Sequence, residues 1–491
     1  MAGDAGEGLL PPGFLLGVAT AGYEVEGGFN GPGQPANNWA TWERTGRVQP
    51  SGDAAGFWRQ PEVCFERAAG LGADAFQMSI EWARVEPADG EVDEGALDRY
   101  AELVVAAAAH GLEPVLTLHH GTHPWWLGEE FWLTPGSPDR FARHAATVAR
   151  HLGARCRRWV TVHRPLSLAA AGWLLGTHPP GRRLAASDAL AVVDNLLTAH
   201  VLAYQALHAV RPDAVVTVDL GPSAAYELDR LYADLLVAPA HGVERSELAP
   251  WLARRRAVHR ASVDPGGRAD PAAAVVAALS PYGPEAPGLA GRLRRPTPGR
   301  LVDAVYAGPA ASTLDAVALA WSDPAVSAPL GRPGGRSSAE RHRSVLRAPW
   351  DEALRPELLA PWVSTEASRH PGRPILVHDQ GMASRTLRGR GYPRRDGATR
   401  PAYLRSQLAA VLDALAAGAP VAGYLHHSLV DGYAWGSFEP RTGLFAMDRD
   451  QGVGPRWCDR DALGDDAAGA WRRLVEGLRH GDRSVFDAPG P

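Results

Sequence analysis

Lysine is absent from this sequence of 491 residues, because all 50 of its Lys+Arg residues are arginine. The absence excludes every chemistry that needs a primary amine on a side chain. No lysine can form a Schiff base with a carbonyl substrate, anchor pyridoxal phosphate or bind phosphates in a P-loop. We therefore expect no cofactor of these kinds, and no other pattern in the sequence indicates a cofactor.

Cysteine is scarce as well. Cys64, Cys156 and Cys458 lie far apart and show no metal-ligand spacing. An odd and sparse set is typical of a reducing compartment and not of a disulfide framework. The first residues contain no basic segment followed by an apolar one, and we find no apolar run long enough to span a bilayer. We expect a cytoplasmic protein that does not contact a membrane.

The net charge is small, −5 at pH 7, and arginine forms no basic stripe. A nucleic-acid-binding surface needs clustered positive charge, so nucleic acid is not an expected partner. With 45% hydrophobic and 21% charged residues, the composition is that of an ordinary globular protein. The expected partner is a small molecule, and the sequence leaves the oligomeric state open.

Short apolar runs rich in Val, Leu and Ile recur along most of the chain and alternate with helical patterns. They show little polar alternation, as expected for parallel strands that are buried on both faces. The predicted strands are Phe14–Thr20, Ala75–Trp82, Glu113–His120, Arg158–Pro165, Ala214–Leu220, Asp315–Ser322, Pro374–Gly381 and Gly423–Leu429.

The helices between these strands have clear boundaries. Asp93 is placed to cap a helix that Gly111 ends, and Ser137-Pro138 begins another. Longer helices are predicted at Ser187–Arg211 and Thr399–Gly418. Eight strands that alternate with helices predict the α/β class and a single (β/α)8 TIM barrel.

One segment, at about 222–314, departs from this alternation. It is rich in Pro, Gly, Ala and Arg, and its periodicity is weak. We interpret it as the fifth helix followed by a long, partly looped excursion before the sixth strand. No linker divides the chain, so residues 1–491 are predicted to form one barrel domain that includes this irregular excursion.

Sequence motifs lie at the ends of the predicted strands. They are FLLGVATAGYEVEG (Phe14–Gly27), NNWATWE (Asn37–Glu43), SIEWARVEP (Ser79–Pro87), LHHGTHP (Leu118–Pro124), GWLLGTHPPG (Gly172–Gly181), ILVHDQGMA (Ile375–Ala383), GYLHHSLVDGYAW (Gly423–Trp435) and PRTGLF (Pro440–Phe445). In this order the chain resembles glycoside hydrolase family 1, the β-glucosidase family, over almost its whole length. The resemblance implies a (β/α)8 barrel and a sugar site at the strand ends.

The resemblance also implies where the catalytic residues should lie, and both positions have changed. The family's retaining mechanism uses two carboxylates about 5–5.5 Å apart. The acid/base glutamate corresponds to Arg164, and the asparagine before it corresponds to His163. A guanidinium stays protonated and cannot act as a general acid. The nucleophile corresponds to Asp379, whose shorter side chain sets its oxygens back by roughly 1–1.5 Å, enough to cost ~10²-fold in rate. These three are the candidate catalytic residues.

Positions that hold the sugar in this family have changed as well. The resemblance puts Glu24 at a glutamine position, His427 at a tryptophan position and Trp321 at the replaced tyrosine of strand six. His120 and the stacking Trp435 are kept. We expect these five residues to bind the ligand, but ordinary β-glucosidase activity is not expected.

Histidines are frequent near the predicted strand ends. Because adjacent strand residues point to opposite sides, we expect His120, His163 and His427 to face the barrel mouth, where they would donate hydrogen bonds or move protons. No zinc-type spacing is present, so no metal site is predicted. The other histidines in these segments are His119, His123, His378 and His426.

The function stays open between an enzyme and a non-catalytic barrel. Arg164 could clamp a phosphate or carboxylate of a ligand, or it could pair with Asp379 or Glu24 in a disused pocket. We favour an enzyme that acts on a glycosylated or sugar-like molecule, by transfer from an anionic leaving group or by isomerisation or cyclisation. The alternatives are a pseudoglycosidase that binds a small molecule or a partner protein, and a weak hydrolase of activated glycosides. Direct contact among the three side chains would favour a non-catalytic barrel, whereas an open cavity would favour an enzyme.

Overall fold

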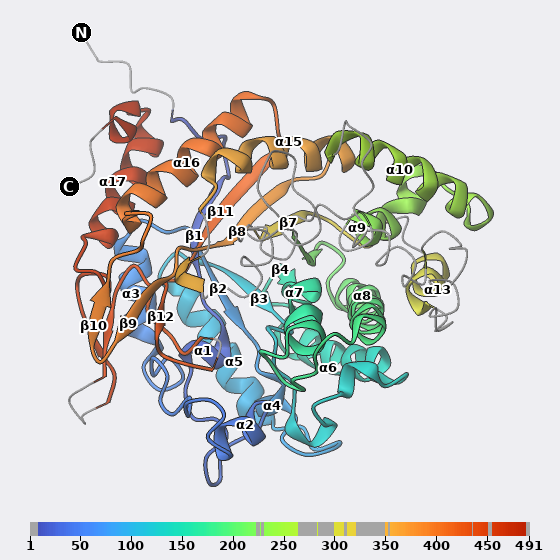
Figure 1. Cartoon of the computed structure of the whole chain (residues 1–491), viewed down its shortest axis with the longest axis horizontal. Helices are drawn as coiled ribbons and strands as arrows, with labels where there is room; N and C mark the ends of the chain where they lie inside the picture. Colours follow the sequence, from blue (N-terminus) through green and yellow to red (C-terminus); the bar gives the residue numbers. More distant parts are fainter. Residues whose placement is uncertain are drawn as a thin grey trace.

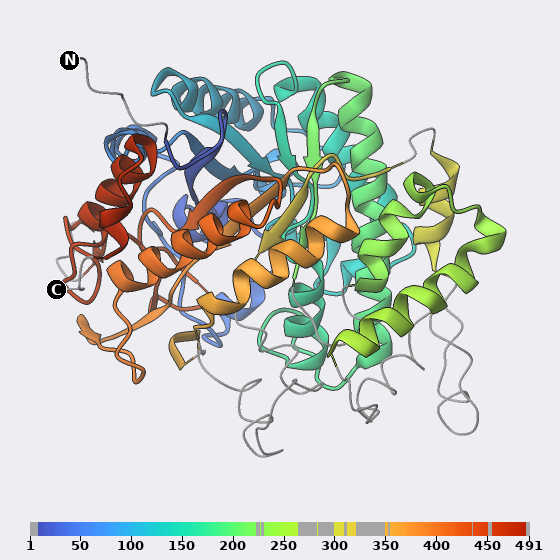
Figure 2. The same ribbon diagram turned by 90° about the horizontal axis from the view of Figure 1, so that it is seen from above.

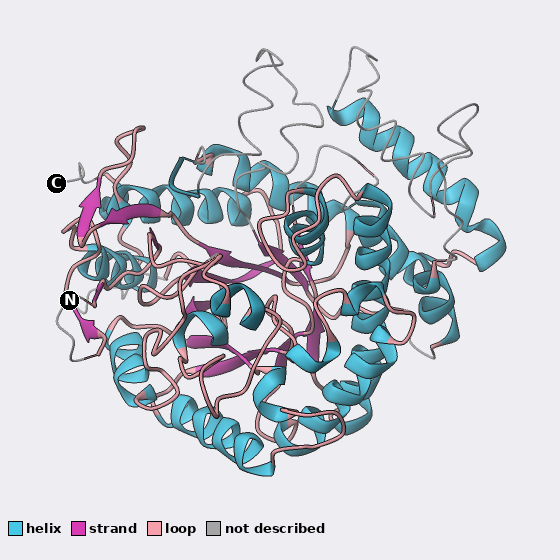
Figure 3. Ribbon diagram, turned by 60° about the horizontal axis from the view of Figure 1, so that its bottom comes forward, coloured by secondary structure: helices cyan, strands magenta, loops and turns pink. Residues whose placement is uncertain are grey.

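A computed structural model describes residues 8–221, 226, 230–263, 282, 299–308, 312–320, 349–351, 354–434, 436–449 and 454–487. A ring of parallel strands lies at its centre and helices surround the ring (Figure 3). The strands of the ring are β1 (Leu15–Ala19), β2 (Ala75–Ser79), β3 (Glu113–Thr117), β4 (Arg158–Val160), β5 (Val215–Thr217), β6 (Asp219–Leu220), β7 (Val317–Ala320), β8 (Ile375–Gln380) and β11 (Val421–His427).

The strands pair in the order β5-β4-β3-β2-β1-β11-β8-β7-β6. Because β5 and β6 are two halves of the fifth predicted strand, the nine strands correspond to the eight of a barrel. Each of the eight predicted strands overlaps one of these parallel strands or, for the fifth, two, and β11 begins two residues before the predicted Gly423. The prediction of a single (β/α)8 barrel is confirmed.

Helices cover the outside of the ring. The α-helices are α1 (Gly22–Val25), α2 (Ala40–Arg44), α3 (Pro61–Gly70), α4 (Trp82–Val85), α5 (Glu94–Ala109), α6 (Ser137–Leu152), α7 (Pro165–Ala169), α8 (Ala186–Val210), α9 (Arg230–Val237), α10 (Leu248–Val263), α13 (Arg300–Ala307), α15 (Leu359–Arg369), α16 (Arg400–Ala416) and α17 (Ala467–His480). The chain also forms two small antiparallel sheets, one of β9 (Ser384–Leu387), β10 (Arg390–Tyr392) and β12 (Pro440–Arg441), and one of β13 (Met447–Asp448) and β14 (Arg456–Trp457). The sheet with β9, β10 and β12 lies beside the barrel at the lower left of Figure 1.

The helix boundaries follow the local signals in the sequence. The Asp93 side chain accepts a hydrogen bond from the Ala96 amide at the start of α5, and Gly111, with φ of +75°, follows its end. Thr399 caps α16 in the same way, through the Ala402 amide. A side-chain oxygen at this position satisfies an amide that the helix itself leaves unpaired.

Helix α8 corrects one expectation. By length and composition it is apolar enough to cross a membrane, although the sequence suggested no such run. In the structure it is a core helix, and 72% of its most apolar window is buried. It packs against α6 and α13, so its apolar residues meet other helices on several sides.

The described part of the excursion is more helical than the weak periodicity suggested. It contains α9, α10 and α13, and α10 stands outside the ring of barrel helices (Figure 1 and Figure 2). Buried Asp194 of α8 accepts a hydrogen bond from the Arg300 amide at the start of α13, 2.9 Å away, and another from the hydroxyl of Tyr282. These contacts tie the excursion to the barrel. Residues 222–225, 227–229, 264–281, 283–298 and 309–311 lie outside the described part.

Two apolar layers support the barrel. The larger lies between the strands and the outer helices. A separate small cluster fills the inside of the ring with Leu15, Ala19, Ala75, Val115, Val160 and Leu425. Inward-facing side chains make a barrel interior a packed core and not a pore. Polar chemistry is therefore confined to the two ends of the barrel.

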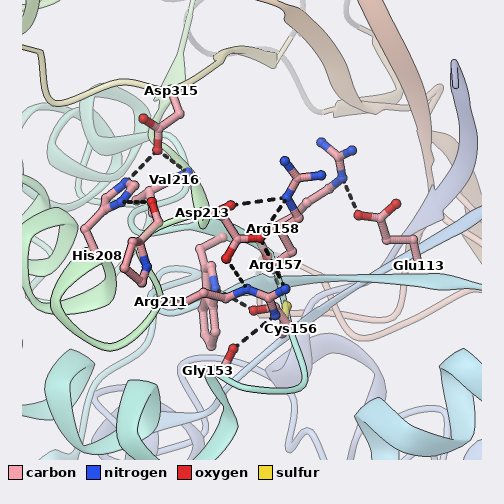
Figure 4. A network of polar contacts seen from close by, with 12 residues as sticks. Glu113, Gly153, Cys156, Arg157, Arg158, His208, Arg211, Asp213, Val216 and Asp315 are labelled. Atoms are coloured by element: carbon pink, nitrogen blue, oxygen red, sulfur yellow. Dashed lines mark hydrogen bonds and ion pairs between the residues drawn. The ribbon is translucent and has the colours of Figure 1, made fainter.

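The amino-terminal end is held by a polar network (Figure 4). Asp315, just before β7, accepts hydrogen bonds from the Val216 amide, the Tyr204 hydroxyl and Nε2 of His208, each at 2.8 Å. One carboxylate thus joins β5, β7 and α8. Contacts at this end of a barrel contribute to stability, because the active sites of barrel enzymes lie at the opposite end.

Replacing Asp315 should therefore destabilise the fold. Asp315→Ala removes three hydrogen bonds to a charged group, so we expect the free energy of unfolding to fall by roughly 2–4 kcal/mol. Thermal or urea denaturation measures the loss. Asp213→Ala is the control, because Asp213 pairs with Arg211 on the exposed surface and such pairs contribute little. Equal melting temperatures for the two variants would contradict the assignment.

Candidate functional site

Six of the predicted site residues, His120 beside His163 among them, come together at the carboxyl-terminal end of the barrel. Arg164 follows β4, Asp379 lies in β8, His427 ends β11, and Glu24 lies in α1, which comes shortly after β1. His163 directly precedes Arg164. Barrel enzymes build their active sites on this face from strand ends and loops. The side chains that the motifs single out are therefore neighbours in space.

Arg164 and Asp379 are in direct contact. A terminal guanidinium nitrogen of Arg164 lies 2.9 Å from Oδ2 of Asp379, and the two side chains are 20% and 8% exposed. At this distance the interaction is a charge-assisted hydrogen bond between largely buried groups. The sequence left open whether Arg164 binds a ligand or pairs with Asp379 or Glu24. The structure has the ion pair between Arg164 and Asp379.

Asp379 has two further partners. Nδ1 of His427 lies 3.2 Å from Oδ1, and Nε2 of His163 lies 3.4 Å from Oδ2. Burial alone would raise the pKa of the Asp379 carboxyl, but Arg164, His427 and His163 outweigh burial and hold it well below its ordinary value. Asp379 is therefore an ionised carboxylate with both oxygens engaged, which makes it a weak base.

The backbone is left-handed at both positions that the resemblance assigns to the catalytic carboxylates. Arg164 has φ of 42° and Asp379 has φ of 53°, a region that residues other than glycine seldom occupy. A residue in this conformation breaks the alternation of side chains along a strand, so adjacent residues can both face the mouth. Strain of this kind costs about 1–3 kcal/mol and concentrates at functional sites.

Asp219, in β6, is a site residue that the sequence did not single out. Its side chain is fully buried. Oδ2 contacts Nδ1 of His163, and Oδ1 lies 2.6 Å from Nε2 of His378. Burial raises the pKa of Asp219, but His378 and His163 lower it more, so it lies below its ordinary value. The available signal was a charged residue inside the apolar fifth strand.

His378 corrects the expectation that only His120, His163 and His427 face inward. Its ring is completely buried and reaches Asp219 on β6 and Gln77 on β2, with Nδ1 3.2 Å from Oε1 of Gln77. The left-handed conformation of Asp379 explains why His378 also points inward, because strict alternation would send the two residues to opposite sides.

Glu24 is linked to Asp379 through a histidine. Nε2 of His427 lies 3.5 Å from Oε2 of Glu24, whose side chain is 22% exposed. Burial and the negative charge of Asp379 raise the pKa of Glu24 from 4.5 to about 8, although Arg164 opposes the shift. At neutral pH Glu24 is therefore a carboxylic acid that donates and accepts a hydrogen bond, as the amide of a glutamine does.

The other two imidazoles of the mouth are uncharged. His120 stacks on His163 with ring centroids 3.8 Å apart, and burial and the neighbouring His163 hold its pKa well below the ordinary value. Burial likewise lowers the pKa of His427, outweighing the attraction of Asp379. Both rings offer neutral hydrogen-bonding groups to a ligand.

Two predicted ligand-binding residues, Trp321 and Trp435, lie outside the described residues. Within the described part of the chain, no group of three or more His, Cys, Asp or Glu side chains is arranged to hold a metal ion. The described side chains of the mouth can form hydrogen bonds and charge pairs, and their imidazoles can transfer protons. Asp379 faces a cation where a retaining glycosidase needs a second carboxyl group.

The raised pKa of Glu24 predicts a pH effect on stability. Between pH 5 and 8 the folded protein holds a proton that the unfolded chain releases, so stability should fall as pH rises. Glu24→Gln removes this proton uptake. As pH rises, the free energy of unfolding of the variant should therefore increase relative to that of wild type, by up to about 1.4 kcal/mol per pH unit. Melting temperatures measured across this range test the effect. Glu66→Gln, at an exposed position of α3, is the control, and its melting temperature should change with pH as that of wild type does. The same pH dependence for Glu24→Gln and wild type would refute the assignment.

Comparison with known proteins agrees with the fold and the motif order. The model of glycosyl hydrolase family 1 matches residues 7–247 and 328–461. Beta-glucosidase 6 of Oryza sativa subsp. japonica is 32% identical over 182 residues, 36% of this chain and 35% of that protein. Thermostable beta-glucosidase B of Thermobispora bispora is 27% identical over 462 residues, 90% of this chain and 87% of that protein.

A solved structure shares the whole architecture. The family 1 β-glucosidase of Thermotoga maritima matches with a TM-score of 0.70 at 20% identity, over 97% of this chain and 99% of that chain. The matches to the first curated relatives, in contrast, span about a third of those proteins. The family model covers well over half of the sequence. This chain belongs to glycosyl hydrolase family 1.

Proposed function

We propose that this family 1 barrel binds a sugar-containing or anionic small molecule at its carboxyl-terminal face and does not hydrolyse ordinary β-glucosides. The observation that carries the proposal is the contact between Arg164 and Asp379, 2.9 Å apart. It joins the two positions at which the resemblance implies a general acid and a nucleophile.

The contact removes both catalytic roles for a physical reason. A guanidinium keeps its proton at every physiological pH, so Arg164 cannot protonate a leaving group. Asp379 stays ionised, but its oxygens are occupied by Arg164, His427 and His163. An attack on an anomeric carbon would first have to break these interactions in a buried site, where they are strongest. Recognition of a ligand needs no such step.

The groups that remain suit a hydroxylated ligand. Glu24 is a neutral acid at pH 7 because its pKa is about 8, and His120 is a neutral imidazole. Each can donate and accept a hydrogen bond, as a sugar hydroxyl does. Nε of Arg164 is buried and has no hydrogen-bond partner within the described residues, so a ligand oxygen could satisfy it. An unpaired buried donor costs about 1–3 kcal/mol, which such a ligand would recover.

An enzyme with altered chemistry is the second candidate, and one observation favours it. His163 lies between two carboxylates, Asp219 and Asp379, in the manner of an imidazole that moves a proton during catalysis. A reaction that needs no leaving-group acid would fit, such as transfer from a phosphate or carboxylate leaving group, isomerisation or cyclisation. The sequence favoured this candidate, whereas the direct Arg164–Asp379 contact supports binding more strongly.

Hydrolysis assays test the proposal. Purified wild-type protein should not turn over cellobiose at an enzyme-like rate, because the leaving oxygen has no acid. An activated aryl β-glucoside serves as the comparison, since its leaving group needs no protonation, and slow release there is compatible with the proposal. Rapid turnover of cellobiose would refute it and would point to Glu24 as the acid.

A double-mutant cycle tests the ion pair itself. Arg164→Gln and Asp379→Asn should each destabilise the fold, by roughly 2–4 kcal/mol, because each leaves a largely buried charge without its main partner. The double variant should recover much of the loss, which denaturation curves would measure as a coupling energy. Additive losses would mean that the pair does not hold the mouth together.

A further inference from the structure

We propose that Asp219 determines the charge of the binding site: by holding His163 and His378 in their doubly protonated form, it leaves the mouth with one net positive charge, and this charge selects a ligand with a single carboxylate or phosphate group. The inference deepens the proposed binding function and rests on it. It names Asp219 as a positioning residue, because Asp219 is buried beneath the mouth and acts through the two histidines.

The first step is the environment of Asp219. Its side chain is fully buried, and its oxygens face two different rings. Oδ2 contacts Nδ1 of His163, while Oδ1 lies 2.6 Å from Nε2 of His378. A buried carboxylate needs cationic or hydrogen-bonding partners because water cannot solvate it. A ring nitrogen that faces an ionised carboxylate must carry the proton, since the carboxylate can only accept.

The second step concerns the opposite nitrogen of each ring. Nε2 of His163 faces Asp379, 3.4 Å away. Nδ1 of His378 faces Oε1 of Gln77 at 3.2 Å, and the amide of Gln77 is oriented by donating to the hydroxyl of Thr117 at 3.0 Å. Each of the four ring nitrogens therefore faces an acceptor oxygen. An imidazole has two donors only when it is a cation, so both rings are imidazolium ions.

The third step is the charge balance of the mouth. Three cations, Arg164, His163 and His378, meet two carboxylates, Asp219 and Asp379. Of the groups around this set, Glu24 is a neutral acid at pH 7, His120 and His427 are neutral imidazoles, and burial raises the pKa of Tyr403 and keeps it neutral. The nearby cation Arg400 is paired with Asp461. One positive charge is left without a counter-ion among the described residues.

The excess charge is best placed to act through Arg164. Of the three cations it is the most exposed, at 20%, compared with 11% for His163 and 0% for His378. Its buried Nε is also a donor that lacks a hydrogen-bond partner among the described residues. A carboxylate or phosphate oxygen beside this guanidinium would supply the missing charge and accept the free hydrogen bond.

The protonation of the two rings can be measured without any ligand. In ¹⁵N-histidine NMR spectra of the full chain, His163→Gln and His378→Gln identify the two signals by their loss. We expect both rings of the wild type to show two protonated nitrogens at pH 7, and both to become neutral in Asp219→Asn, whose amide cannot stabilise a cation. A neutral ring at either position in the wild type would overturn the charge balance.

Calorimetric titration with inorganic phosphate tests the ligand class. Phosphate should bind the wild type, and Asp219→Asn and Arg164→Gln should each bind it at least tenfold more weakly. Asp213→Asn, on the surface at the opposite end of the barrel, is the matched control and should bind as the wild type does. If Asp219→Asn fails to fold, His378→Gln should show the same tenfold loss.

The two proposals fail in different ways. Phosphate that does not bind the wild type would overturn the anionic ligand class, and equal binding by wild type and Asp219→Asn would overturn the role of Asp219. Neither result concerns hydrolysis. Turnover of cellobiose would refute the proposed function, while the NMR result would still decide the protonation of the histidines.

Discussion

The contact between Arg164 and Asp379 is the interaction on which the rest of the barrel mouth depends. Because the guanidinium compensates a buried carboxylate, Asp379 stays ionised. The persistent negative charge of Asp379 in turn helps to keep Glu24 protonated up to about pH 8. A single ion pair thus sets the charge of one carboxyl group and the neutrality of another. The protonation states of the site form one coupled system and not a set of independent residues.

Much of the barrel is held together by contacts away from this site. The inner cluster around Leu15 and Val115 and the contacts of Asp315 at the amino-terminal end lie away from the mouth. Glu26 and Arg84, 2.7 Å apart beside α1, form a further buried pair that does not involve Asp379. A (β/α)8 scaffold can therefore keep its fold while the strand-end residues change, which is why the fold alone does not define the activity.

The proposed binding function rests on charge and hydrogen bonding at this mouth. The resemblance implies two carboxylates separated by the space for a glycosidic bond, whereas the structure has a carboxylate surrounded by Arg164, His163 and His427. Such an arrangement holds oxygen-rich or anionic groups well, because its donors are fixed and partly removed from water.

The sequence by itself determined the eight strands, the helix cap at Asp93, and the motifs that carry Arg164 and Asp379 at two strand ends, because these features are local in the chain. Only the tertiary structure decided that Arg164 touches Asp379 and that Asp219 and His378 lie beneath them. Those contacts join strands that are distant in the sequence, and they depend on left-handed backbone conformations that no sequence period predicts. The protonation of Glu24 was likewise decided by tertiary structure, since a pKa depends on burial and on neighbouring charges.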